Sequence, residues 1–203
     1  MHGWRLIVAS LCLATAMPAF AGGVLRIQAS GYEDFSCRNG AREESEQCDD
    51  GNADDLDGCT SQCRVSVACR ADAFPGGDRF VVDAATGRCY VLHTEELLTV
   101  NQATSVCSTQ GGHLASLTSA AEAALLQPSL QAGQRLWIGA TDLPEEGSFA
   151  WLTGEPFAYQ PFAAGQPDGD GDCLVVDAAT GTWSDTGCEL AAFATGFICE
   201  IEP

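Results

Sequence analysis

Apolar and polar positions divide the chain into two parts with different patterns. From about residue 37 to 66 large apolar residues are almost absent, whereas from residue 67 onward short apolar runs recur between turn residues. A segment as short and polar as the first cannot build its own core, so cross-links must hold it together. The roughly 135 residues of the second part are enough for one compact domain.

Within residues 67–203 the pattern predicts an α+β domain. One helix is expected over 99–109, where apolar residues share a helical face and a Gly-Gly pair follows. A capping box at 119–122 opens a second helix, which ends near Pro128. Short strands are expected between turn residues, at 79–83, 89–92, 135–140, 149–152, 173–177, 181–184 and 196–200.

A long loop rich in glycine, proline and aromatic residues lies between Leu152 and Cys173. Loops of this length inside compact domains are usually functional. Its last part, G-Q-P-D-G-D-G-D-C, places Asp168, Asp170 and Asp172 at alternate positions. Carboxylate oxygens suit a hard cation such as calcium, but the run lacks the later glycine and glutamate of an EF-hand loop.

The N-terminus has the pattern of a secretory signal over residues 1–21. Arg5 precedes an apolar run that includes Cys12, and Ala-Phe-Ala at 19–21 matches a cleavage site. The run is too short to span a bilayer, and no other stretch comes near the required length, so no membrane insertion is expected. These features predict a secreted or cell-surface protein in which residues 22–36 form a linker.

Cysteine usage and charge agree with export. Of the 11 cysteines, those after the signal form an even set, which in an exported chain predicts five disulfides. The net charge is −19, from 28 acidic and 9 basic residues, and no lysine is present. Such a balance argues against binding to nucleic acid or to anionic membranes.

The polar first part carries a recognisable motif. Residues 46–52 read E-Q-C-D-D-G-N, and D-G-C at 57–59 follows, with Cys63 after it. Residues 37–66 resemble the four-cysteine repeat of secreted proteins from myxobacteria and their relatives (the DUF4215 type). The text D-G-N-A-D from residue 50 begins like a calcium loop, and turn formation is the alternative. Three pairings of its cysteines stay open: Cys37, Cys48, Cys59 and Cys63.

Six motifs follow one another in order after residue 69. They are the helix ending in Cys107 with G-G-H-L, L-W-I-G at 136–139, Q-P-D at 166–168, the loop cysteine, T-W-S-D at 182–185 and F-I-C-E at 197–200. In this order they resemble the C-type lectin domain. The resemblance implies two helices, small antiparallel sheets and a long loop region, with Trp137 and Trp183 in the core. It also implies the disulfides Cys107–Cys199, Cys173–Cys188 and Cys69–Cys89.

The resemblance also implies a carbohydrate-binding site built on calcium. Gln166 and Asp168 match the family's Q-P-D ligands, which lean toward galactose-type sugars, and Pro167 matches a proline that is cis in calcium-binding members. Asp185 matches the aspartate of the family's W-N-D motif, and Ser184 replaces its asparagine. A glycan or glycoconjugate is therefore the expected partner, and calcium the expected cofactor.

Further ligands are implied with departures from the family pattern. Gly171 stands where an acidic ligand is usual, so Asp170 or Asp172 is expected to supply that oxygen instead. An auxiliary calcium ion is implied at Asp142 and Glu146, with Asp172 as a third ligand. Calcium suits such sets because it accepts six to eight oxygens in flexible geometry.

No catalytic constellation accompanies these motifs. The chain has no G-x-S-x-G elbow and no H-E-x-x-H helix, and its histidines are His2, His93 and His113. We therefore predict a binding protein and not an enzyme. The alternative to a calcium-dependent lectin is a calcium-independent C-type-lectin-like module that binds protein or serves a structural role, favoured by Ser184 and the short loop.

Overall fold

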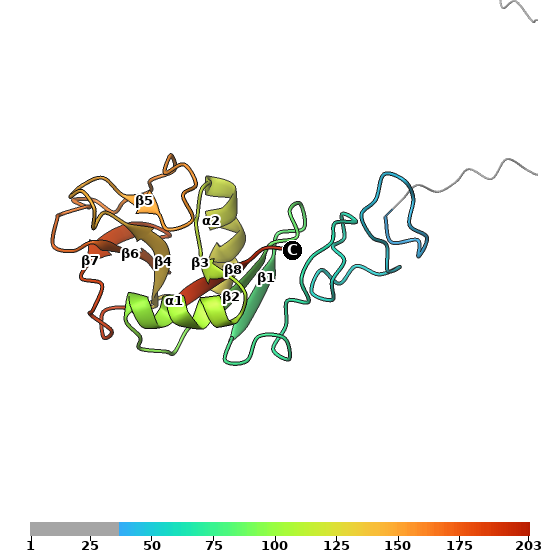
Figure 1. The fold of residues 1–203 in the computed structure, drawn as a ribbon, viewed down its shortest axis with the longest axis horizontal. Helices are drawn as coiled ribbons and strands as arrows, with labels where there is room; N and C mark the ends of the chain where they lie inside the picture. Colours follow the sequence, from blue (N-terminus) through green and yellow to red (C-terminus); the bar gives the residue numbers. More distant parts are fainter. Residues whose placement is uncertain (1–36) are drawn as a thin grey trace, which may run out of the picture. The chain divides into compact units, whose positions relative to one another are not determined.

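The computed structural model describes residues 37–203 (Figure 1). The predicted signal at 1–21, with Cys12, and the linker at 22–36 lie outside the described residues. None of the helices in residues 37–203 is long and apolar enough to cross a membrane. The strands are β1 (Arg79–Val82), β2 (Cys89–His93), β3 (His113–Leu114), β4 (Arg135–Thr141), β5 (Ala150–Trp151), β6 (Cys173–Asp177), β7 (Trp183–Thr186) and β8 (Gly196–Ile201).

The strands pair into one sheet with the order β1-β2-β8-β4-β6-β7, while β3 adds to β8 and β5 to β4. All pairings are antiparallel except that of β4 with β8. That parallel pairing, at Leu136 and Trp137, joins the two antiparallel halves that the lectin resemblance implies as small sheets. Both helices lie beside the half of the sheet that contains β1, β2 and β8, whereas β6 and β7 lie beside the long loop (Figure 1).

Local capping explains where both predicted helices begin. Helix α1 (Val100–Thr109) starts after Thr99, whose side chain and backbone exchange hydrogen bonds with Gln102. Helix α2 (Ala120–Leu126) starts after Ser119, which forms the predicted capping box with Glu122. The proline that ends the second helical pattern opens a short 3-10 turn, η1 (Gln127–Ser129).

Buried tryptophans and disulfides organise the core. Trp137 and Trp183 are fully buried, as expected. Cys107–Cys199 joins α1 to β8, and Cys173–Cys188 closes the base of the long loop, as the resemblance implies; Cys69–Cys89 is the third bond of this domain. Because the first of these closes the longest loop, with a sequence separation of 92, it is worth about 4–5 kcal/mol on a chain-entropy model.

Two strand assignments differ from the sequence prediction by more than one residue at an end. Strand β7 begins two residues later than expected, because Gly181 has a φ of +69° and belongs to a tight turn closed by its N–H to the carbonyl of Asp177. Strand β3 was not anticipated, since two residues are too few to show a periodic pattern. It pairs with β8 at Glu200 and Cys199.

The polar segment has its own cross-links. Its disulfides are Cys37–Cys63 and Cys48–Cys59, so one of the three open pairings is formed. Asp49 accepts hydrogen bonds from four backbone N–H groups. Burial alone would raise the pKa of Asp49, but these four donors outweigh it and hold that pKa below its ordinary value. Asp50, Asn52 and Asp54 each accept from the backbone N–H two residues on, as turn-forming residues do.

Candidate functional site

The Q-P-D motif and strand β7 meet in one hydrogen-bond network. Asp185 accepts from the backbone N–H groups of Asp168, at 3.0 Å, and Gly169, at 2.9 Å. Its own N–H donates to the Gln166 Oε1 at 2.9 Å. The Gln166 Nε2 in turn donates to the Asp168 Oδ2 at 2.8 Å, across a cis Gln166–Pro167 peptide bond. The structure therefore brings together three of the expected ligands from two distant segments.

These ligands differ in how far they face solvent. Asp185 is buried, Gln166 is half-buried and Asp168 is exposed. Every carboxylate oxygen of Asp168 and Asp185 already accepts a hydrogen bond from the protein. Ser184, the fourth expected residue, is half-buried and forms no side-chain hydrogen bond within residues 37–203.

Close backbone packing explains the missing acidic residue of the short loop. A Cβ atom at Gly171 would lie 2.0 Å from the carbonyl carbon of Thr186, so no side chain fits there. Asp170 and Asp172 flank this contact. Asp170 is exposed, and its N–H donates to Asp168. Asp172 is half-buried, and its backbone oxygen accepts from the N–H of Asp142 at 3.2 Å.

A second group of carboxylates, Asp142, Glu146 and Asp172, forms what we call the acidic cluster. Asp142 is 1% exposed; its Oδ2 accepts from the N–H of Gly147 at 2.8 Å, while its Oδ1 is buried with no hydrogen-bond partner. The negative charge of Asp142 is the main cause that raises the pKa of Glu146, with burial, Asp172 and Asp185 adding to it. Within residues 37–203 no arginine or histidine forms an ion pair with these carboxylates.

The donor atoms fit calcium at the acidic cluster better than at the Q-P-D network. Both sets offer only oxygen, which a hard cation prefers. The acidic cluster adds a buried, unpartnered oxygen and mutual repulsion, which a divalent cation would relieve. In neither set do three acidic ligand atoms of the described chain come within 4.8 Å of one another, so a bound ion would draw these side chains closer together.

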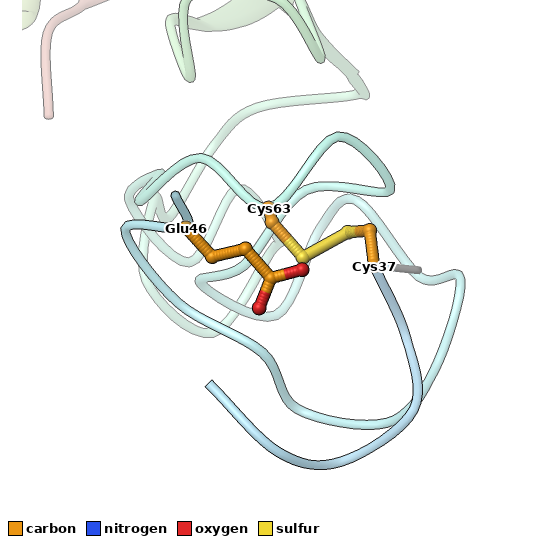
Figure 2. Close-up of side chains that lie close together, drawn as sticks. All are labelled: Cys37, Glu46 and Cys63. Atoms are coloured by element: carbon orange, nitrogen blue, oxygen red, sulfur yellow. A yellow bond between two sulfur atoms is a disulfide. The ribbon is translucent and has the colours of Figure 1, made fainter. Parts of the chain in front are cut away.

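Residues 37–203 contain three tighter groups of possible ligand atoms, one of them Glu43, Glu46 and Asp49, and in the other two the chemistry is already used. Figure 2 shows the Glu46 carboxylate beside Cys37 and Cys63, whose sulfurs are bonded to each other and so offer no thiolate. Glu200 is fully buried and pairs with Arg88 at 3.2 Å. The sequence analysis missed this arginine, although an arginine directly before a buried strand was a usable signal.

The aromatic residues of the long loop surround Trp183. Rings of Trp151, Phe157, Tyr159 and Phe162 have centroids within 5.4–6.1 Å of the Trp183 ring centroid. They therefore form the core of the loop. A hollow of about 320 Å³ opens beside them, lined by Gly147, Ser148, Phe149, Phe157, Gln160, Phe162 and Pro167.

Comparison with known proteins agrees with this geometry. Residues 96–201 match the model of the lectin C-type domain. C-type mannose receptor 2 of Mus musculus is 29% identical over 125 residues, which are 60% of this chain and only 8% of that receptor. The mouse scavenger receptor C-type lectin carbohydrate-recognition domain is 30% identical with a TM-score of 0.53, covering 63% of this chain and 96% of that domain.

A third similar protein was solved in the presence of sugar. It is the cow C-type carbohydrate-recognition domain of CD23 with a GlcNAc2Man3 oligosaccharide, 27% identical with a TM-score of 0.51, covering 57% of this chain and 88% of that one. The matched family is one of binding proteins. The family match at 96–201 includes both helices, strands β3 to β8, the Q-P-D loop and the acidic cluster, and it begins after β1 and β2. This chain therefore belongs to the C-type lectin domain family.

Proposed function

We propose that this protein binds carbohydrate, with calcium, at the Q-P-D loop, and that it leans toward galactose-type sugars. The observation that carries the proposal is the single hydrogen-bond network of Gln166, Asp168 and Asp185. Residues 19 positions apart in sequence are held together there, while Asp168 stays open to solvent. A binding site needs this combination of a fixed base and an accessible polar edge.

The residues of the network have separate tasks in this proposal. Asp185 fixes the loop by accepting two backbone N–H groups, and it would hold calcium together with Gln166 and Asp168. Calcium, when bound, supplies open coordination positions that sugar hydroxyls can fill. The Asp168 carboxylate accepts a hydrogen bond from a sugar hydroxyl, and the Gln166 amide donates one, so the order of donor and acceptor selects the hydroxyl geometry.

We further propose that the acidic cluster holds an auxiliary calcium ion. Asp142, Glu146 and Asp172 would ligate it, and the unpartnered Asp142 Oδ1 supports this assignment. The N–H of Asp142 binds the backbone of Asp172, so the cluster connects the turn after β4 to the long loop. An ion there stabilises the loop on which the sugar-binding residues lie.

Export and the N-terminal repeat complete the proposal. The signal pattern at 1–21 directs the protein to the cell surface or the medium, where its five disulfides are stable. The four-cysteine repeat at 37–66 precedes the lectin domain at 67–203. In this location the lectin domain would meet glycans outside the cell.

Titration calorimetry of the mature chain with calcium, followed by galactose, tests the proposal. We expect heat on calcium addition, and galactose binding only when calcium is present. Asp168→Ala should abolish galactose binding while leaving the fold intact, because its side chain is exposed. Asp72→Ala is the matched control, since this aspartate is 73% exposed and pairs only with Arg70 at the surface.

A motif swap tests the sugar preference separately. Gln166→Glu with Asp168→Asn exchanges the donor and acceptor ends of the bond between these side chains. We expect affinity to move from galactose toward mannose. Unchanged preference would refute the assigned role of the two residues, and absence of any calcium-dependent sugar binding would refute the lectin proposal.

One observation favours a second function. All carboxylate oxygens of Asp168 and Asp185 already have protein donors, and Ser184 offers only a hydroxyl in place of an amide. A C-type-lectin-like module that binds protein without calcium would show these features. Calcium-independent binding, with no heat on calcium addition, supports that alternative.

A further inference from the structure

A second hollow, away from the Q-P-D motif, is lined by exposed leucines. It measures about 570 Å³ and lies between the first turn of α1, the end of β4 and the loop after β7. Five large apolar side chains are exposed in residues 37–203, and three of them line this hollow: Leu143 at 65%, Leu152 at 52% and Leu190 at 53%. Apolar side chains that are exposed together in one patch mark interaction sites, whereas single exposed apolar residues need no explanation.

The walls of this leucine groove are held in place. The Cys173–Cys188 disulfide forms one side. The carbonyl of Cys188 accepts from the N–H of Val100 at 3.1 Å, which ties the loop after β7 to α1 at the same end of the domain (Figure 1). The Asn101 side chain donates to Glu189 at 3.1 Å. The groove is therefore formed in advance, and a ligand loses little by ordering it.

Charge at the groove has one sign. Asp172 and Glu189 are the charged residues that line it, and no basic residue does. The arginines of the lectin domain are Arg70, Arg79, Arg88 and Arg135, and all lie outside the lining. With a net charge of −19, a second copy of this chain or an anionic membrane would be repelled. A basic partner would be attracted.

We propose that the leucine groove docks a segment of a partner protein in which a lysine or arginine lies next to a large apolar residue. The apolar side chain enters between Leu143, Leu152 and Leu190. The basic side chain pairs with Glu189 at the rim, which is exposed and has only Asn101 as a side-chain partner. No residue of the Q-P-D motif lines the groove, and the groove shares only Asp172 with the acidic cluster, so docking does not require the sugar site.

Selection from a random heptapeptide display library tests the proposal with the mature chain as bait, in calcium and in chelator. We expect enriched peptides to combine Lys or Arg with Leu, Ile or Phe. The enriched peptides are then synthesised, and their affinity for the variants of this protein is measured. The affinity should fall at least about tenfold in Leu143→Ser with Leu190→Ser. In Glu189→Gln it should fall about threefold or more and depend less on salt.

Matched variants separate the groove from the rest of the surface. Leu97→Ser removes a leucine that is 61% exposed but lies outside the groove, and Glu44→Gln removes an exposed charge of the N-terminal repeat. Neither should change peptide binding. Circular dichroism checks that the paired leucine variant is folded, and Leu152→Ser alone gives a milder second test.

Three outcomes with the mature chain would overturn the proposal, and a fourth comes from a shortened chain. The three are enrichment of acidic or purely polar peptides, equal losses in the Leu97→Ser control, and reversible self-association by sedimentation that Leu143→Ser with Leu190→Ser abolishes. The last would make a second copy the occupant. Peptide binding that appears only after deletion of residues 22–36 would assign the groove to this chain's own N-terminal segment, and would equally contradict a partner protein.

Discussion

Two buried carboxylates of this domain, those of Glu200 and Asp142, differ in whether a positively charged side chain lies beside them. Glu200 is fully buried in β8, where its Oε2 accepts from the N–H of Ser116 at 2.9 Å. Its Oε1 forms no hydrogen bond within residues 37–203 but lies 3.2 Å from the Arg88 Nη1, as an ion pair. Asp142 is just as buried after β4, yet its Oδ1 has neither a hydrogen bond nor an ion pair in the described chain. The Glu200 carboxylate therefore has a protein cation, Arg88, as its partner, and the Asp142 carboxylate has none among the described residues.

The two environments carry different meanings. Arg88 is bonded to four glutamates, and burial works against its charge, but Glu200 and its neighbours raise its pKa further. An arginine held in this way stays charged, and its removal would leave Glu200 buried without a countercharge. The acidic cluster is open to an exchangeable cation, so its occupancy can vary with the solution. The contrast separates a structural ion-pair network from a candidate metal site, although both look acidic in sequence.

The largest expected effect is on the structural network. Arg88→Met leaves Glu200 buried and unpaired, and we expect the free energy of unfolding to fall by about 3–5 kcal/mol. Urea unfolding measures it. Arg70→Met, whose ion pair is exposed on both sides, should change stability by less than about 1 kcal/mol. Adding Glu200→Gln to Arg88→Met should recover part of the loss, and no recovery would contradict the pairing.

Calcium should produce the next largest effect, at the acidic cluster. At a concentration a hundredfold above its dissociation constant, the ion should add about 2.7 kcal/mol to the free energy of unfolding. Asp142→Asn keeps the acceptor for Gly147 but removes the charge. We expect it to abolish the calcium response and, in chelator, not to lower stability, because the repulsion between Asp142 and Glu146 is removed. A calcium response that persists in Asp142→Asn would place the ion elsewhere.

A smaller effect is expected from pH at Glu200. Burial raises the pKa of Glu200 above its ordinary value of 4.5, although Ser116 and Arg88 oppose this shift. The folded chain therefore holds this proton to higher pH than the unfolded chain. Its stabilising contribution is complete below the ordinary value and is lost as pH rises through the folded-state pKa, with a slope of at most about 1.4 kcal/mol per pH unit.

Comparison of the wild type with Glu200→Gln isolates that dependence. The free energy of unfolding of the wild type should fall, relative to the variant, as pH rises from about 4.5, the ordinary glutamate value. Denaturant melts across this range measure the difference. Parallel curves for the two proteins would contradict a raised pKa for Glu200.

The smallest effect is expected at the outer edge of the same network. Glu202 pairs with Arg88 at 3.2 Å but is 60% exposed. Since water screens the pair, Glu202→Gln should change the free energy of unfolding by only about 0.2–0.5 kcal/mol. An effect as large as that of Arg88→Met would mean that the network does not weaken toward solvent.

Local sequence patterns predicted most of the fold. The capping box at Ser119 could be predicted because it needs only residues three positions apart, whereas the one at Thr99 was recognised only in the structure and the first helix was predicted from its apolar face. Strand limits were less certain, and β7 began two residues late because a positive φ at Gly181 extended the turn. The parallel contact of β4 with β8 joins residues about 60 positions apart, and no local pattern encodes it.

The sites show the same division. The Q-P-D motif, the acidic residues at 142 and 146 and the cysteines could be located by resemblance, because they occur in a family order. The contacts that these residues form depended on packing between segments that are distant in sequence. Gly171 excludes a side chain because the Thr186 backbone lies against it, and Asp168 is tied to Asp185 across the loop. Arg88 and the leucine groove were missed because their partners are dispersed along the chain.

Residue order alone was thus sufficient for the class of fold, the helix starts, the cysteine inventory and the position of the candidate sugar loop. All of these depend on short-range periodicity or on motifs a few residues long. Whether a buried carboxylate meets an arginine, as Glu200 does, or has no cationic partner in the described chain, as with Asp142, required the folded arrangement. Electrostatic partners and grooves are set by distances through space, which the spacing along the chain does not report.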